Sequence, residues 1–118
     1  MEYYDELLKT IEKWGAEPIE DEWLFESFRQ NILVTISPPE AFKLIDGTID
    51  VLTTQTDEST AIEVVETILA LARHSDTTEL PSKLVEDLPR MSKQFEAYGI
   101  YAKDKLKELF SFYRLPIE

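Results

Sequence analysis

The stretch of sequence that decides the fold is DESTAIEVVETILALARH, residues 57–74. Apolar side chains fill most of it, and they do not alternate with polar ones as they would in a half-buried β-strand. Glu63 and Glu66 interrupt the run three residues apart. This pattern predicts a helix that is apolar around most of its circumference. Such a helix needs neighbours on several sides, so we expect it to be the central helix of the protein.

The clearest local signal lies upstream of this stretch, at Ser37-Pro38-Pro39-Glu40. A serine followed three residues later by a glutamate can form a capping box, in which each side chain accepts a hydrogen bond from the other residue's backbone N–H. Proline is tolerated in the first helical turn. We therefore expect a helix over residues 38–52, with Gly47 as a point that allows close packing. Its inward residues are expected to be Phe42, Ile45, Ile49 and Leu52.

Two further helices are expected closer to the N-terminus. The first covers about residues 2–15, and Gly15 is placed to end it; its apolar stripe consists of Tyr4, Leu7, Leu8, Ile11 and Trp14. The second runs over about residues 21–36 and buries Trp23 or Leu24, Phe28, Ile32 and Leu33 or Ile36. Residues 31–36 are rich in β-branched side chains and could be extended, but the chain offers no second strand to pair with them. A helix is therefore preferred.

The C-terminal part of the chain is expected to hold two more helices. Pro81 and Ser82 can open the first of them, and Pro89 must kink it or divide it in two. Gly99 stops this apolar pattern, and a last helix covers about residues 102–113.

The expected fold is all-α, with about six antiparallel helices in one helical domain that covers residues 1–118. Two architectures fit the short connections: a compact bundle, or a short HEAT-like stack of helical hairpins. Pairing the second helix with the third and the fourth with the fifth gives units of the length typical of such hairpins. No repeated residue signature favours either architecture.

The charge of the chain restricts its partners. Twenty-four acidic residues against twelve basic ones give a formal net charge of −12. Such a field repels phosphate backbones and anionic lipids and attracts basic proteins. We therefore expect no nucleic-acid partner and no membrane association. The alternative that the acidity only maintains solubility fits the charge equally well.

The sequence also suggests a location and excludes several chemistries. No cysteine is present, and residues 1–6 lack the basic and apolar features of a secretory signal, so a cytoplasmic location is expected. His74 is the only histidine and is expected to interact with the dipole at the end of the central helix. A hydrolase triad or a zinc site lacks the residues that it needs, and no glycine-rich phosphate loop occurs. The sequence predicts no cofactor, no metal and no enzyme.

A surface for a basic protein partner is predicted from like charges on consecutive helices. Asp46 and Asp50 are four residues apart and Glu63 and Glu66 three apart, so each pair shares a helix face and repels by about 0.2–0.5 kcal/mol. A cationic partner would relieve this repulsion, although solvent screening could also suffice. The predicted acidic face consists of Asp46, Asp50, Glu63 and Glu66, joined by Asp57 and Glu58.

The small size, the acidity, the lack of cysteine and the helical-hairpin pattern resemble the immunity proteins of bacterial polymorphic and contact-dependent toxin systems. The segment ILALARHSDTTELP, residues 68–81, is similar to a hairpin connection in all-helical members. The resemblance implies a stoichiometric inhibitor that covers a basic toxin domain, often a nuclease, with an acidic surface.

Two other functions stay open. One is a helical adaptor or regulatory subunit that binds its partner through an apolar groove between hairpins, and the other is an enzyme with paired carboxylates. No motif supports the enzyme. Oligomeric state is not predicted.

Overall fold

The computed structural model describes residues 2–16 and 23–115, which form seven α-helices and no strand. The helices are α1 (Tyr3–Ala16), α2 (Leu24–Leu33), α3 (Pro38–Thr53), α4 (Glu58–His74), α5 (Ser82–Glu86), α6 (Leu88–Phe95) and α7 (Ile100–Phe112). The expected all-helical fold is confirmed. The seventh helix arises because Pro89 divides the expected fifth helix: it lies in the first turn of α6, where its missing N–H costs no hydrogen bond.

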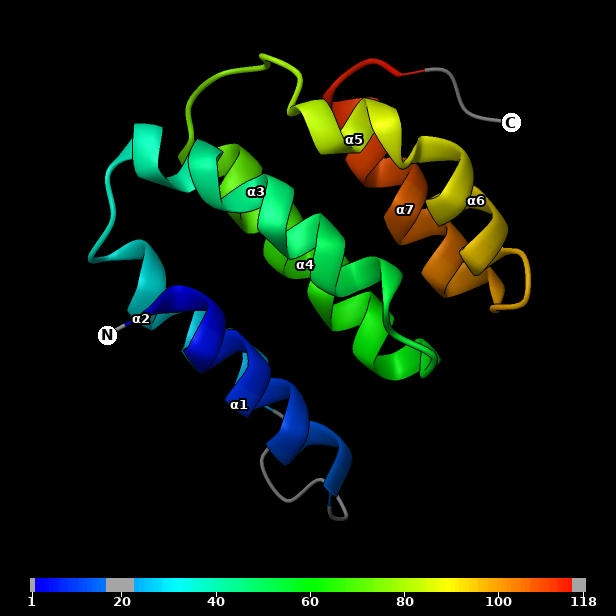
Figure 1. Ribbon diagram of the computed structural model, residues 1–118, viewed down its shortest axis with the longest axis horizontal. Coiled ribbons are helices and arrows are strands. Elements are labelled where there is room, and N and C mark those ends of the chain that lie inside the picture. Colours follow the sequence, from blue (N-terminus) through cyan, green and yellow to red (C-terminus); the bar gives the residue numbers. More distant parts are fainter. Residues whose placement is uncertain (1, 17–22, 116–118) are drawn as a thin grey trace.

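The helices form three hairpins that lie side by side (Figure 1). Helix α1 pairs with α2, α3 pairs with α4, and α5 and α6 together pair with α7. In one layer α4 lies between α2 and α7 and contacts both, and in the other layer α3, α5 and α6 contact one another. The shortest dimension of the molecule, 18 Å, fits two such layers with helix axes about 8–10 Å apart. The structure is thus a compact bundle built from stacked hairpins.

The predicted pairing of the second helix with the third and of the fourth with the fifth is wrong. Helix α3 packs most extensively against α4, and α2 packs against α1 and α4. The reason is that α4 has apolar side chains on several sides. Four helices therefore pack against it: α1, α2, α3 and α7.

Helix α4 is the central helix, as expected from its composition. Its buried residues point in several directions around the axis: Thr60, Ala61, Val64, Val65, Thr67, Ile68, Leu69, Leu71 and Ala72. Burial of each large aliphatic side chain contributes about 1.5–3 kcal/mol. Asp57 caps the N-terminus of α4, since its carboxylate accepts a hydrogen bond of 2.9 Å from the backbone N–H of Thr60.

The capping box at the start of α3 is confirmed. The Ser37 hydroxyl accepts a hydrogen bond from the Glu40 backbone N–H at 3.3 Å, and the Glu40 carboxylate accepts one from the Ser37 N–H at 3.0 Å. The hydrogen bonds from Ser37 lower the pKa of the Glu40 carboxyl. Inside α3, Ile45, Ile49 and Leu52 are buried as expected, whereas Ala41 takes the buried position predicted for Phe42, which is half-buried.

Helix α1 docks on α3 through two tyrosines. The Thr48 hydroxyl donates its hydrogen to the Leu44 carbonyl at 2.7 Å, so in the 2.9 Å contact between the Tyr3 and Thr48 hydroxyls Tyr3 is the donor. Tyr4 donates to the Leu44 carbonyl at 3.2 Å and lies directly over Gly47. A side chain at position 47 would meet the Tyr4 ring, which is the close packing that Gly47 was expected to allow.

The two N-terminal helices differ from the prediction in detail. Tyr3 is buried, while Leu8 is 51% exposed, and α1 continues through Gly15 to Ala16. Trp23 is 61% exposed and Leu24 half-buried, so the buried aromatic residue near the start of α2 is Phe25.

Helix α2 begins at Leu24 and ends at Leu33, whereas residues 21–36 were expected to be helical. Residues 21 and 22 lie outside the described ranges. At the other end, Thr35 donates its hydroxyl to the Ile32 carbonyl at 2.8 Å and thereby competes with helix continuation. The β-branched residues after Leu33 therefore end the helix without forming a strand.

Substitution of the glycines tests this packing. Gly47→Ala should lower the free energy of unfolding by about 1–2 kcal/mol, because overpacking against Tyr4 exceeds the gain in helix propensity. Gly15→Ala is the matched control: among the described residues no atom lies within 4 Å of its added methyl group, so it should stabilise the protein by about 0.5–1 kcal/mol. Urea denaturation followed by circular dichroism measures both. Equal stabilisation by the two substitutions would contradict the contact between α1 and α3.

Candidate functional site

The acidic residues of α3 hold α5 in place. Asp46 accepts a hydrogen bond of 3.1 Å from the Ser82 hydroxyl and one of 3.0 Å from the backbone N–H of Lys83. It thereby supplies an acceptor for a first-turn N–H group of α5 that has no partner within the helix. Asp50 forms an ion pair of 3.2 Å with the ammonium of Lys83. The hydrogen bond to Asp50 and the charge of Asp50 raise the pKa of Lys83.

The acidic residues of α4 face three different elements. Glu58 accepts a hydrogen bond of 3.2 Å from the backbone N–H of Gly99, directly before α7. Glu63 forms an ion pair of 3.2 Å with Arg29 of α2, in which the side chains are 24% and 13% exposed. Glu66 forms an ion pair of 3.3 Å with Lys105 of α7.

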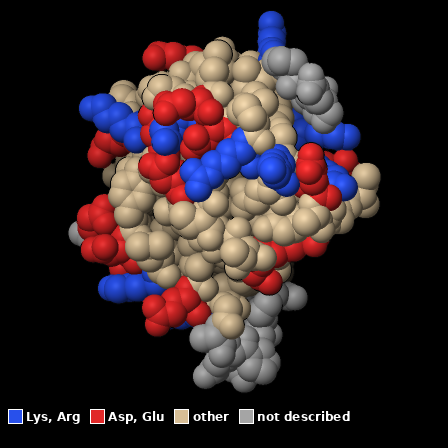
Figure 2. Space-filling view, turned by 45° about the vertical axis from the view of Figure 1, so that its right-hand side comes forward, with Lys and Arg blue, Asp and Glu red and all other residues tan. Residues whose placement is uncertain are grey.

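The six acidic residues of the predicted face therefore do not gather into one cluster. Each forms a contact within the chain: Asp46 and Asp50 with α5, Asp57 with the first turn of α4, Glu58 and Glu66 with α7, and Glu63 with α2. The assumption that their like charges lack compensation is wrong, because partners from other helices supply it. Figure 2 shows acidic and basic side chains interspersed over the face that it draws. Contact of these residues with a partner protein stays a prediction.

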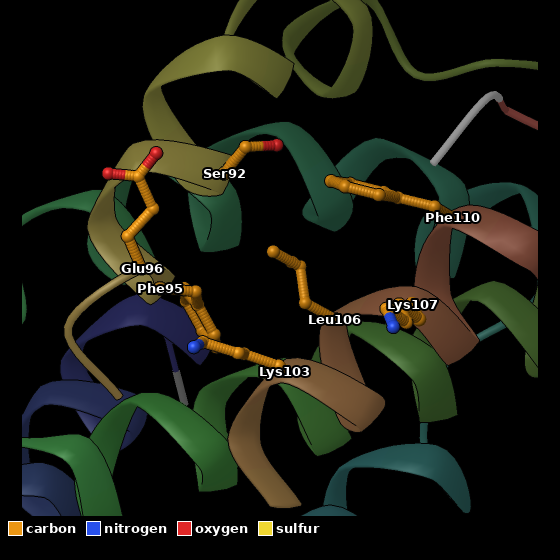
Figure 3. A pocket seen from close by; sticks show the side chains of 7 residues that line it. All are labelled: Ser92, Phe95, Glu96, Lys103, Leu106, Lys107 and Phe110. Carbon is orange, nitrogen blue, oxygen red and sulfur yellow. The ribbon is translucent and has the colours of Figure 1, made fainter. Parts of the chain in front are cut away.

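A groove of about 290 Å³ lies between α6 and α7. Its floor consists of Phe95, Leu106 and Phe110, which are at most 5% exposed and also belong to the core. Its polar lining consists of Ser92, Glu96, Lys103 and Lys107 (Figure 3).

The spacing of the lining residues explains how two helices make one groove. Residues 92 and 95 share one face of α6, which residue 96 at its C-cap extends, and residues 103, 106, 107 and 110 share one face of α7. Ser92 is the smallest of these side chains and leaves space open opposite Leu106 and Phe110, as Figure 3 shows.

Polar contacts hold both walls of the groove against the rest of the protein. On the α6 side, the Gln94 amide donates to the carbonyls of Leu52 and Gln55 at 2.9 and 3.0 Å, which ties α6 to the end of α3. On the α7 side, Glu58 and Glu66 bind the backbone of Gly99 and the side chain of Lys105. The groove is thus fixed in place by contacts that lie outside it.

The lysines of α7 fall into two groups. Burial alone would lower the pKa of Lys105, but its hydrogen bond to Glu66 and the charges of Glu66 and Glu108 raise it instead. Lys103 and Lys107 line the groove and form no ion pair with any described residue. Being one turn apart on the same face, they repel each other by about 0.2–0.5 kcal/mol. Among the described residues, no ion pair offsets the repulsion between these two lysines.

Sequence reasoning left open an apolar groove between hairpins but assigned no residues to it. The groove observed lies inside the last hairpin. One signal for it is visible in the sequence: Lys103 and Lys107 alternate with Leu106 and Phe110 on one helical face. What the sequence hides is the open space at Ser92, which depends on how α6 is placed over α7.

The remaining candidate residues have structural surroundings. The Nε2 atom of His74 lies 2.8 Å from the Ile36 carbonyl and ties the end of α4 to the segment before α3. No group of three or more acidic or histidine side chains within residues 2–16 and 23–115 is arranged to hold a metal ion. Among the helices that the structure describes, none is long and apolar enough to cross a membrane.

In comparisons with protein-family models, with curated proteins and with solved structures, no match to this chain was found. Any function must therefore be argued from the residues themselves.

Removal of a carboxylate tests the structural role of the acidic residues. Glu63→Ala should lower the free energy of unfolding by about 1–2 kcal/mol, because it leaves the mostly buried Arg29 guanidinium without its anion. Glu12→Ala removes an exposed carboxylate of α1 that forms no hydrogen bond or ion pair with a described residue, and should change stability by less than about 0.5 kcal/mol. Urea denaturation of both variants measures the difference. A Glu63 variant as stable as the Glu12 variant would show that the ion pair contributes nothing.

Proposed function

We propose that this chain is a protein-binding module that seats a segment of its partner in the groove between α6 and α7. The observation that carries this proposal is the combination of an apolar floor with two rim lysines that have no ion pair in the described structure. Interfaces commonly place an apolar anchor in a pocket and surround it with polar contacts. The groove provides both.

The proposed mechanism is stoichiometric binding without turnover. An apolar side chain of the partner would fill the groove above Phe95, Leu106 and Phe110. A volume of about 290 Å³ is just below the range for small-molecule pockets, about 300–1,000 Å³, and suits one or two anchor side chains. The charged rim would then set specificity and the association rate.

Inhibition of a basic protein, as by an immunity protein that neutralises a toxin domain, is the second candidate function. Residues 1–82 contain 18 acidic and five basic residues, whereas residues 83–118 contain six acidic and seven basic ones. Asp5, Glu12 and Glu26 of α1 and α2 are exposed and form no ion pair with another described residue. The acidic excess of residues 1–82, with these exposed acids of α1 and α2, supports attraction of a basic partner. A cytoplasmic location, proposed from the lack of cysteine, is compatible with both candidates.

Site-specific cross-linking distinguishes the two functions. A photoreactive benzoylphenylalanine is placed at Ser92 in the groove, at Glu12 on α1, or at Ser111, an exposed position of α7 outside the groove lining. The full-length variants are irradiated in the source cell, and each cross-linked protein is identified, purified and tested for direct binding. We expect a partner that cross-links from position 92 and not from position 111.

Variants of the same positions then test the purified partner. Ser92→Trp fills the groove and should weaken binding at least about tenfold, or about 1.4 kcal/mol, while Ser111→Trp should leave it unchanged. A basic partner that cross-links only from position 12, and that tolerates Ser92→Trp, would overturn the groove function and support the inhibitor instead.

A further inference from the structure

The sign of the charge around the groove is opposite to that of the whole chain. The protein carries a formal charge of −12, but the α7 wall of the groove presents Lys103 and Lys107. The α6 wall presents Glu96, which lies across the groove from these lysines in Figure 3. Because fields between exposed charges are screened beyond about 8 Å at physiological salt, the rim rather than the net charge determines what the groove accepts.

From this arrangement we infer that the occupant of the groove is an acidic amphipathic helix of the partner. Its apolar stripe covers Phe95, Leu106 and Phe110, and its carboxylates, spaced one turn apart along one flank, pair with Lys103 and Lys107. This inference rests on the proposed binding function and names the chemical class of the partner segment.

The length and shape of the groove favour a helix as the occupant. The lining residues of α7 run from Lys103 to Phe110, and the seven helical steps between them span about 10.5 Å, or two helical turns. A helix laid along such a groove presents apolar anchors at intervals of three and four residues. Its flanking carboxylates then repeat at the same interval as the two lysines. An isolated aliphatic side chain would pack on the apolar floor but leave both lysines without an ion-pair partner.

The two walls of the groove carry opposite charges, so the two flanks of the bound helix must carry different side chains. Carboxylates beside α7 pair with lysines, whereas carboxylates beside α6 would face Glu96. The acidic stripe is therefore on one flank of the apolar stripe, and a basic amphipathic helix is disfavoured by the lysine pair. Lys105 does not contribute to this recognition, because its ammonium already forms ion pairs with Glu66 and Glu108.

Three synthetic peptides test the inference. Each is about 14 residues long, a length at which an alanine-rich helix is marginally stable in water, and each carries the same apolar stripe. The flank carries glutamate in the first peptide, glutamine in the second and lysine in the third. Binding to the full chain is measured by fluorescence anisotropy at low and at high salt. We expect the glutamate peptide to bind at least about tenfold more tightly than the glutamine peptide, with an advantage that shrinks at high salt.

Charge-reversal variants of the protein provide the matched control. The double substitution Lys103→Glu and Lys107→Glu should reverse the preference between the glutamate and lysine peptides. Lys13→Glu with Lys43→Glu changes the net charge by the same amount at exposed positions of α1 and α3 that form no ion pair with described residues. This control should keep the preference for glutamate. Circular dichroism and thermal unfolding verify that both double variants are folded.

Three results would overturn the inference. Equal affinity for all three peptides, lost in Ser92→Trp, would show that the groove binds segments without selecting acidic ones, and the proposed function would survive. Binding of the glutamate peptide that is insensitive to Ser92→Trp and to reversal of the lysines would place it outside the groove. No binding of any peptide would exclude the amphipathic helix as occupant, while cross-linking from position 92 would still decide the proposed function.

Discussion

Helix α4 can be stable in water only if other helices cover it on several sides, because its apolar residues point around most of its circumference. Helix α3 covers one side of α4, α1 and α2 cover further sides, and α7 of the last hairpin covers the remaining one. Two layers of helices follow from this arrangement. The acidic side chains of α4 therefore lie at its contacts with neighbouring elements. Glu63 pairs with Arg29 of α2, and Glu66 pairs with Lys105 of α7. Glu58 accepts a hydrogen bond from the backbone N–H of Gly99, directly before α7.

The acidic residues that first suggested a binding face thus act mainly on the internal geometry of the protein. Asp46 and Asp50 fix α5, and Glu58 and Glu66 fix α7. Together with Gln94, which holds α6 on the end of α3, they position the two helices that form the groove. Compensation of the acids leaves Lys103 and Lys107 as a pair of like charges with no ion pair in the described structure. These two lysines lie in the C-terminal part of the chain, whereas most of the acidic excess lies in residues 1–82.

The features that could be predicted from sequence depend on neighbours in the chain. The capping box at Ser37, the N-terminal boundary at Asp57 and the break at Pro89 are set by residues within one helical turn. What could not be predicted depends on the packing of distant residues. Glu63 pairs with Arg29, which lies 34 positions away in the sequence. Phe25 rather than Trp23 is buried, and this depends on where α2 contacts α1 and α4. Like charges one turn apart on a helix are visible in the sequence, but the residues that compensate them lie on other helices. The open space of the groove could not be predicted either, because it results from the placement of the small Ser92 over α7.

The central claim is that a partner binds between α6 and α7 while the acidic residues hold the helices together. The most direct test is nuclear magnetic resonance of the full isotope-labelled chain, titrated with the glutamate-flanked amphipathic peptide. The account predicts that the largest changes in amide chemical shift lie in α6 and α7 around Ser92, Phe95 and Leu106, with little change near Asp46 and Asp50. Changes concentrated on α1 and α2, or around the acidic residues of α3, with the groove unaffected, would contradict it.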